Sequence, residues 1–282
     1  MPIYTDFKYN YVEDPIFYYG FEKFEHLFPN VDLYFGAKTH DNITSPSVNK
    51  KILFSTEEQV DDNDPNHNVA DVLLLEEFVD SILSISPLSD KKEKPKNNLK
   101  LERHYVFQPF NEEFEPKDKS KLWDVIYTGG DSVGHAMDIV NVIKNFFLYR
   151  HVSFKGQFAT NTNVTYKEKL QLIANSKINI IHNIVSDTIP QLKTRPFEAA
   201  FCKSLMICRY DKFKTIEKWF TPNEDFIYYD NESNLEQIIK DTLDNYNNYQ
   251  FMIENAYNKA KKEYTTEQFV KKYLIHEDII RD

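Results

Sequence analysis

The stretch KTRPFEAAFCKSLMIC, residues 193–208, decides the fold, because it joins the start of a helix to a buried strand. The predicted helix begins at Arg195, with Lys193 just before it, so the segment opens with two cations. Glu198 lies in the first turn, where a carboxylate can compensate the helix macrodipole. Small alanines at 199–200 permit close packing, and the apolar residues 205–207 return the chain to a sheet. A helix that leads directly into a buried strand is typical of an α/β protein.

The same alternation of strand and helix extends through the second half of the chain. Strands are predicted at Trp123–Tyr127, Val152–Lys155, Ile178–His182, Leu205–Ile207 and Phe226–Tyr229, and helices at Gly134–Phe147, Tyr166–Ala174 and Arg195–Phe201. From Leu235 onward the pattern is helical. The run Ile178–His182 is almost continuously apolar and branched, as expected of a parallel strand that is buried on both faces. These features predict a doubly wound, mostly parallel sheet.

The first half of the chain carries a similar pattern. Strands are predicted at Phe7–Val12, Val31–Phe35, Ile52–Ser55, Ser81–Ser86 and His104–Gln108, with a helix that Asp14 caps and Pro15 opens. Residues 90–100 and 111–121 are charged and contain Pro, and the second stretch is the expected domain boundary. We therefore expect an N-terminal domain of residues 1–112, a second domain of residues 113–264 and a C-terminal helix of residues 265–282.

The composition argues against several classes of function. Lys and Arg number 34 against 44 Asp and Glu, a formal charge of −10, so nucleic acid is not an expected partner. No apolar run reaches the roughly 18–20 residues of a membrane span, and no apolar signal segment begins the chain, which predicts a cytoplasmic protein. Cys202 and Cys208 are expected to be reduced core thiols. The histidines show no metal-ligand spacing, so no metal site is predicted.

Gly129 and Gly130 are the first candidates for a binding site. They follow a predicted strand and precede a predicted helix, where backbone N–H groups and the positive helix end can hold a phosphate. The spacing is not the dinucleotide fingerprint, because no third glycine stands at the required offset. The pair can equally be a plain tight turn, and Asp131 would repel a phosphate unless its side chain points away.

The 193–208 stretch, together with Thr221–Phe226, resembles the C-terminal domain of glycosyltransferases with two Rossmann-like domains, the GT-B fold. The similarity is to the CgeB-like and glycosyl transferase group 1 type, in which an Arg-x-Phe-Glu-Ala-x-x-Cys/Gly stretch leads into an apolar strand. It covers about Asp124–Tyr264 and extends weakly to Val79–Pro87. The Lys- and Asn-rich sequence is also similar to those of glycosyltransferases encoded by large DNA viruses of algae. A viral enzyme of this kind would be located in the host cytoplasm.

The resemblance implies a nucleotide-sugar site in the second domain and no cofactor. Glu198 would bind the ribose hydroxyls, and Arg195 or Lys193 would neutralise the diphosphate, for which a guanidinium fork is well suited. The other implied donor-binding residues are Gly129, Gly130 and Ser132 at the phosphates, Gln157 and Phe158 around the base, and Asn183 in the pocket wall. The implied donor is UDP-linked, less readily GDP-linked, and the acceptor a glycan or glycoprotein. The C-terminal helix would cross back to the first domain.

One departure from the family pattern bears on the mechanism. Many retaining members carry a second Glu eight positions before the ribose-binding one, and here that position is Pro190. This favours an inverting, metal-independent transfer, which needs a general base. The expected catalytic base comes from the first domain, with Glu57 and Asp14 as first choices and Asp41 as the third. A helix-cap role for Asp14 and a solvated position for Glu57 remain open.

Two other interpretations remain open. In Asp62-Asn63-Asp64, an Asp-x-Asp motif shortly after a strand is the way GT-A transferases hold Mn²⁺ or Mg²⁺ against the donor diphosphate. The surrounding segment is so polar that it also fits a solvated turn. The second alternative is a catalytically inactive sugar- or nucleotide-binding protein with the same fold, because a fold does not imply a function.

Overall fold

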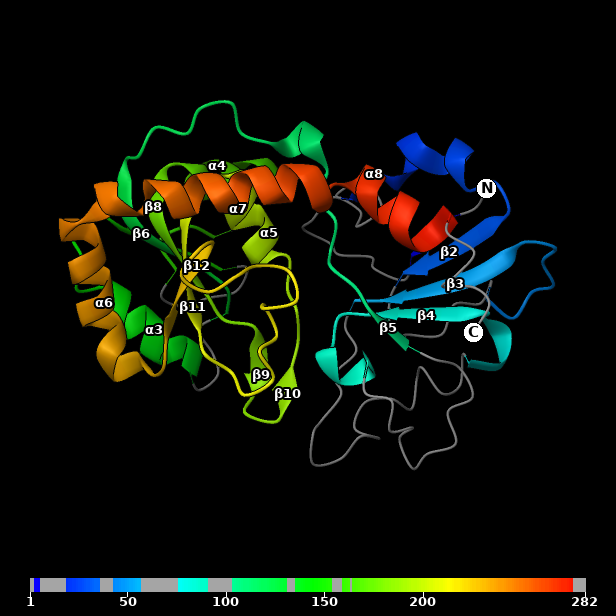
Figure 1. Cartoon of the computed structure of the whole chain (residues 1–282), viewed down its shortest axis with the longest axis horizontal. Helices are drawn as coiled ribbons and strands as arrows, with labels where there is room; N and C mark the ends of the chain where they lie inside the picture. Colours follow the sequence, from blue (N-terminus) through cyan, green and yellow to red (C-terminus); the bar gives the residue numbers. More distant parts are fainter. Residues whose placement is uncertain are drawn as a thin grey trace. The chain divides into compact units, whose positions relative to one another are not determined.

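A computed structural model describes residues 3–5, 19–35, 43–56, 76–90, 103–130, 135–153, 159–162 and 164–275. The chain forms two compact units, each built around a parallel five-stranded sheet (Figure 1). Unit 1 comprises Met1–Asn111, Ile184–Lys193 and Tyr264–Asp282, and unit 2 comprises Glu112–Asn183 and Thr194–Glu263. The predicted α/β class with two Rossmann-like sheets is confirmed. The domain limits expected from the sequence remain a prediction.

The sheet of unit 2 has the strand order β12-β11-β8-β6-β7. Its strands are β6 (Trp123–Thr128), β7 (Tyr149–Val152), β8 (Ser176–Ile181), β11 (Leu205–Arg209) and β12 (Phe226–Tyr229). All neighbouring pairs are parallel. In the central strand β8, Ile178, Ile180 and Ile181 are fully buried, as a strand covered on both faces requires.

Helices cover both faces of this sheet (Figure 1). On one face α3 (His135–Ile143) packs against α6 (Glu232–Asp244), and on the other α5 (Arg195–Phe201) packs against α4 (Tyr166–Ala174) and α7 (Gln250–Glu263). A short 3-10 turn, η5 (Tyr246–Tyr249), joins α6 to α7. Helix α4 begins with a capping box in which Thr165 and Glu168 exchange hydrogen bonds. The start of α4 is therefore fixed by its own local sequence.

The sheet of unit 1 has the order β1-β2-β3-β4-β5 and is also parallel. Its strands are β1 (Ile3–Thr5), β2 (Val31–Phe35), β3 (Lys50–Ser55), β4 (Ser81–Ser84) and β5 (Arg103–Tyr105). Short 3-10 helices are η1 (Phe21–Leu27), η2 (Glu76–Phe78) and η3 (Pro87–Asp90), while η4 (Glu112–Phe114) begins unit 2. An antiparallel pair, β9 (Ile184–Ser186) and β10 (Ile189–Pro190), belongs to unit 1.

The end of the chain packs on unit 1. It forms α8 (Thr266–Phe269) and a π-helical segment, η6 (Val270–Ile275). Phe269 is fully buried, and its ring centroid lies 5.5 Å from that of Phe21, 5.2 Å from that of Phe54 and 5.3 Å from that of Phe107. The hydroxyl of Thr266 also donates to the carbonyl of Tyr19. An aromatic cluster therefore attaches this late segment to the N-terminal sheet.

Several predicted elements match the structure in full, and others differ at their ends. The helices at 166–174 and 195–201 and the strand at 226–229 have the predicted limits. The strand predicted at 152–155 is wrong in position, because β7 ends at Val152 and begins at Tyr149. The helix predicted to Phe147 ends at Ile143, and the strand predicted to Gln108 ends at Tyr105. The strand predicted at 7–12 and the helix after Asp14 lie outside the described residues.

Candidate functional site

The carboxyl edge of the unit 2 sheet has a topological switch point between β6 and β8. From β6 the chain passes to β7 on one side, whereas β8, on the other side of β6, is followed by β11 further away. In open α/β sheets, ligands bind outside the strand ends where the connections diverge in this way. Gly129 and Gly130 follow β6, and His182 and Asn183 follow β8. Three of the predicted site residues, Gly129, Gly130 and Asn183, are therefore placed at this point.

Gly129 lies close to the ends of two neighbouring side chains, those of Tyr127 and Arg195. Its N–H donates to the carbonyl of Val152 at 2.9 Å, and its own carbonyl lies 3.0 Å from Nε2 of His151. A Cβ at residue 129 would come within 2.7 Å of the Tyr127 hydroxyl and 2.9 Å of Nη2 of Arg195. A side chain here would displace one of these groups, so the glycine permits their close approach.

Arg195 brings a cation to this edge. It is the first residue of α5, and its Nη1 donates to the carbonyl of His182 at 3.0 Å. The guanidinium carbon lies 5.8 Å from the ring centroid of Tyr127, within the range of a cation–π contact. A guanidinium has five N–H donors, and the bond to His182 uses one of them. The remaining fork can bind an anion such as a phosphate in bidentate geometry.

Asn183 places a buried polar group after β8, at the same edge of the sheet. Its side chain is 4% exposed, and its Oδ1 has no hydrogen-bond partner among the described residues. A buried acceptor without a donor costs free energy. A ligand that donates a hydrogen bond at this position would therefore be favoured.

Glu198 is 1% exposed and already has a charged partner. The ammonium of Lys169, on α4, lies 2.8 Å from Oε1 and 2.7 Å from Oε2 of Glu198. An ionised carboxylate offers about four lone-pair sites, and the hydrogen bond from Lys169 uses one of those on Oε1. Oε2 is close to the ammonium but has no hydrogen-bond partner among the described residues. The ribose-binding role implied by the resemblance stays a prediction. In this structure the carboxylate joins α4 to α5.

Burial also affects a thiol beside this ion pair. Cys202 is fully buried one turn after Glu198, and its Sγ donates to the carbonyl of Leu170 at 3.3 Å. Burial, assisted by the negative charge of Glu198, raises the pKa of the Cys202 thiol well above its ordinary value. Burial likewise raises the pKa of Cys208. Both cysteines are free thiols, as predicted, and neither is an activated nucleophile.

The other predicted site residues belong to unit 1 or lie outside the described residues. Lys193 belongs to unit 1, where its ammonium contacts Oε1 of Gln191. Ser132, Gln157 and Phe158 lie outside the described residues. So do the three candidate bases, Glu57, Asp14 and Asp41, and the two aspartates of the GT-A alternative, Asp62 and Asp64.

Sequence reasoning missed three residues that support this site. The ring of Tyr127 contacts the Arg195 guanidinium, and its hydroxyl lies close to Gly129. His151 contacts the Gly129 carbonyl. Lys169 forms an ion pair with Glu198. Tyr127 and His151 also stack, with ring centroids 5.7 Å apart. Each role arises from a contact between separate elements, and no local pattern in the sequence indicates it.

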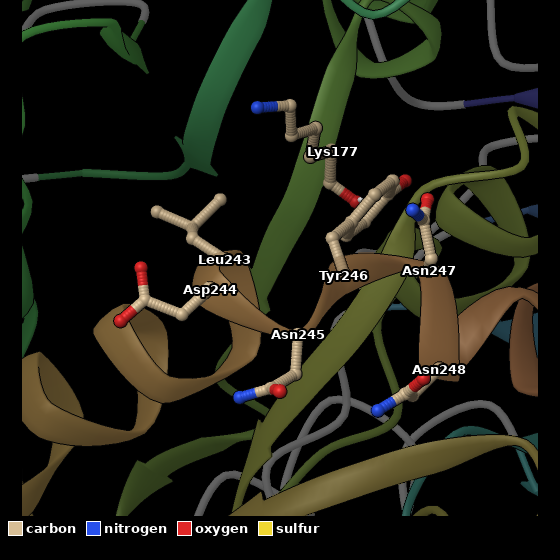
Figure 2. Close-up of a pocket in the computed structure, with 7 residues that line it drawn as sticks. All are labelled: Lys177, Leu243, Asp244, Asn245, Tyr246, Asn247 and Asn248. Atoms are coloured by element: carbon tan, nitrogen blue, oxygen red, sulfur yellow. Dashed lines mark hydrogen bonds between the residues drawn. The ribbon is translucent and has the colours of Figure 1, made fainter.

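A hollow of unit 2 lies at the opposite edge of the sheet from the switch point. It is lined by Lys177 and residues 243–248, and Figure 2 shows the ring of Tyr246 beside Lys177. The Tyr246 hydroxyl donates to the Lys177 carbonyl at 3.3 Å, and the Lys177 ammonium binds Asp124 at 2.8 Å. Lys177 is the second residue of β8, so this hollow lies roughly 15 Å along the strand from His182. It is not part of the switch-point site.

Neither a metal cluster nor a membrane helix was found in the parts of the chain that the structure describes. No three His, Cys, Asp or Glu side chains within the described ranges could together hold a metal ion. No helix in those ranges is both long and apolar enough to cross a membrane.

Comparison with known proteins gives the class of this fold. Residues 142–275 match a family described as glycosyl transferase-like. The structure resembles Staphylococcus aureus TarM (TM-score 0.59, 10% identity, covering 89% of this chain and 55% of TarM). It also resembles Anabaena HepE in complex with UDP and glucose (TM-score 0.60, 11% identity, covering 86% of this chain and 76% of HepE). A third similar structure is that of the pneumococcal O-GlcNAc transferase GtfA in complex with UDP and GlcNAc (TM-score 0.58, 11% identity, covering 93% of this chain and 60% of GtfA). No curated protein matches the sequence significantly.

These findings define a protein with the GT-B fold, in which two parallel five-stranded sheets are present. The family match covers residues 142–275, and the two sheets match those of GT-B glycosyltransferase structures. The predicted resemblance is thus confirmed, and the GT-A alternative does not fit this architecture. The chain spans a little over half of the length of TarM and about three quarters of the length of HepE.

Proposed function

We propose that this protein is a glycosyltransferase that binds a nucleotide-sugar at the β6/β8 switch point and transfers the sugar to a glycan or glycoprotein acceptor. The observation that carries the proposal is the contact between Arg195 and Gly129. A guanidinium held at the carboxyl ends of parallel strands, beside a glycine without a side chain, fits a diphosphate in charge and in space.

The donor is proposed to be UDP-linked. HepE and GtfA, which resemble this chain, were crystallised with UDP, and this supports UDP over GDP. Arg195 would neutralise the diphosphate, Gly129 and Gly130 would admit it to the backbone, and Asn183 would donate to or accept from the sugar. Glu198 would accept from the ribose through Oε2, which has no hydrogen-bond partner among the described residues.

The reaction is proposed to be an inverting single displacement without a metal ion. The acceptor hydroxyl oxygen attacks the anomeric carbon, and the bond from that carbon to the donor phosphate oxygen breaks. The nucleoside diphosphate leaves with the electron pair, and a carboxylate base takes the hydroxyl proton. Arg195 would stabilise the negative charge that develops on the leaving phosphate. Glu57, Asp14 and Asp41 remain the candidate bases, and Pro190 stands where many retaining enzymes have a Glu.

Binding is tested by thermal stabilisation with UDP, GDP, CMP and UDP-sugars, in EDTA and in Mn²⁺. A ligand at about 100 times its dissociation constant stabilises a protein by about 2.7 kcal/mol. We expect UDP or a UDP-sugar to stabilise the wild type in EDTA and Arg195→Ala to lose this effect. Lys262→Ala, at an exposed lysine of α7, is the matched control and should respond as the wild type. Stabilisation by no nucleotide would contradict the proposal, and stabilisation only in Mn²⁺ would contradict its metal-independent form.

Turnover and stereochemistry need a separate assay. Turnover is measured as release of UDP from the UDP-sugar that stabilises the protein. The anomeric configuration of the product is read by NMR, and we expect it to be inverted relative to the donor. Among Glu57→Gln, Asp14→Asn and Asp41→Asn, one variant should lose turnover while it retains UDP binding. Binding without turnover under any acceptor would instead indicate an inactive sugar-nucleotide-binding protein.

A further inference from the structure

His151 is a fully buried histidine whose ring lies against the backbone of the candidate site. Its Nε2 is 3.0 Å from the carbonyl oxygen of Gly129, and the ring stacks on Tyr127. A carbonyl oxygen can only accept a hydrogen bond, so Nε2 carries the proton and donates it. The other ring nitrogen, Nδ1, is buried and has no hydrogen-bond partner among the described residues. Within the described part of the chain, the bond to Gly129 is therefore the polar contact of this ring.

This contact sets the direction of the next peptide group. The Gly129–Gly130 peptide is planar and trans, so the N–H of Gly130 points opposite to the carbonyl of Gly129. Both polar groups of Gly129 face β7, since its N–H donates to Val152 and its carbonyl accepts from His151. The N–H of Gly130 consequently points to the other side of β6, where β8 ends.

The Gly130 N–H has no acceptor among the described residues. Gly130 is exposed and makes no hydrogen bond to any described residue. It lies on the side of β6 that carries His182, whose carbonyl also holds the Arg195 guanidinium. A backbone N–H and a guanidinium on the same side of a strand end form a pair of donors for an anion.

We propose that His151 is a positioning residue of the donor site, which holds the Gly129 carbonyl so that the Gly130 N–H points to the donor diphosphate. This inference rests on the proposed function and adds to it a residue that does not touch the ligand. Removal of the imidazole would free the peptide to rotate and would lower diphosphate affinity without removing any group that contacts the nucleoside.

The test uses ¹⁵N-glycine labelling of the full chain, which has six glycines and therefore gives six amide signals. Gly130→Ala identifies the Gly130 signal by its disappearance. In the wild type we expect this signal to move when UDP is added and to stay when uridine is added. His151→Leu should abolish the movement and lower UDP affinity about tenfold, the loss expected for one hydrogen bond to a charged group. His151→Gln, whose Nε2 can donate to the same carbonyl, should restore both.

A control variant, Thr160→Val, separates positioning from a general loss of structure. The Thr160 hydroxyl accepts from the His151 N–H at 2.9 Å and donates to the His151 carbonyl at 3.0 Å. Thr160→Val removes both hydrogen bonds but leaves the ring contact, and it should respond as the wild type. Wild-type UDP affinity with an unchanged Gly130 response in His151→Leu would overturn the inference. A wild type that binds UDP without any movement of the Gly130 signal would overturn it as well, while the proposed function stands. A wild type that binds no nucleotide would overturn both.

Discussion

The guanidinium of Arg195 occupies the space that a side chain at residue 129 would need. Nη2 of Arg195 would lie 2.9 Å from a Cβ built on Gly129, although the two residues belong to different elements of unit 2. The glycine at the end of β6 and the cation at the start of α5 therefore depend on each other. The local sequence does not indicate this contact.

Gly129→Ala should weaken UDP binding because it displaces Arg195. We expect a loss of affinity of about tenfold or more, close to the loss of one charge-assisted hydrogen bond. The measurement is calorimetric titration of UDP into Gly129→Ala, Arg195→Ala and the double variant. If the alanine acts through Arg195, the double variant binds no more weakly than Arg195→Ala. Additive losses would show that residue 129 acts on the ligand independently of the guanidinium.

Lys169→Met should destabilise unit 2 by leaving the Glu198 carboxylate buried without its partner. Breaking a fully buried ion pair costs roughly 3–5 kcal/mol, and the partial exposure of Lys169, 22%, reduces this to about 2–3 kcal/mol. Urea unfolding gives the free energy. Lys169→Met combined with Glu198→Gln should recover part of the loss, since no charge is then left unpaired.

The matched control for this pair is Lys240→Met. Lys240 pairs with Glu236 at 2.5 Å on the surface of α6, where the two side chains are 52% and 33% exposed. Exposed pairs contribute little, so we expect a change within about 0.5 kcal/mol. Equal losses in the two lysine variants would contradict the special role of the Lys169–Glu198 pair.

Lys121 should make stability depend on pH in the alkaline range. Its ammonium donates to the carbonyls of Ala174 and Lys203, each at 2.7 Å, and burial lowers its pKa from the ordinary 10.5 to about 8. Between about pH 8 and 10.5 the unfolded chain therefore binds more protons at this site than the folded chain. The free energy of unfolding therefore rises with pH across this window, by at most about 3 kcal/mol from Lys121. This gain in stability disappears as the pH falls back to 8.

The measurement compares urea unfolding of the wild type and Lys121→Met at several values between pH 7.5 and 10.5. Groups common to both proteins cancel in the difference. We expect the stability of the wild type to rise relative to that of Lys121→Met as the pH increases. Lys262→Met, at a lysine that is 81% exposed, should give a curve parallel to the wild type. Parallel curves for Lys121→Met would contradict the lowered pKa.

Elements with a regular local pattern could be predicted from the sequence. Helix α4 has a capping box and α5 has Pro196 in its first turn, and both were located to the residue. Strand β7 was misplaced because two of its four residues, Arg150 and His151, are polar. In the folded chain Arg150 lies 3.2 Å from the ring centroid of Trp123, and His151 donates to Gly129. These tertiary partners compensate for the polarity, and no local rule contains them.

The same distinction applies to the candidate site. Gly129, Asn183 and Arg195 could be selected from the sequence because they follow strands or open a helix, and strand ends converge at one edge of a parallel sheet. Tyr127, His151 and Lys169 could not, since each acts through a residue distant in the sequence. The ribose role of Glu198 was inferred from a family pattern, whereas the ion pair with Lys169 required coordinates.

Phe269→Ala should destabilise unit 1 although the residue lies near the end of the chain. Its ring is fully buried against Phe21, Phe54 and Phe107, so truncation leaves a cavity and should cost about 3–5 kcal/mol. Phe251→Ala, at a phenylalanine of α7 that is 54% exposed, is the matched control and should cost under about 1 kcal/mol. Hydrogen exchange distinguishes the units: amides of β2 and β3 should lose protection in Phe269→Ala, and amides of β8 and β11 should keep it. Loss of protection in both sheets would show that the units unfold together, and unchanged protection in β2 and β3 would show that the aromatic cluster does not hold the N-terminal sheet.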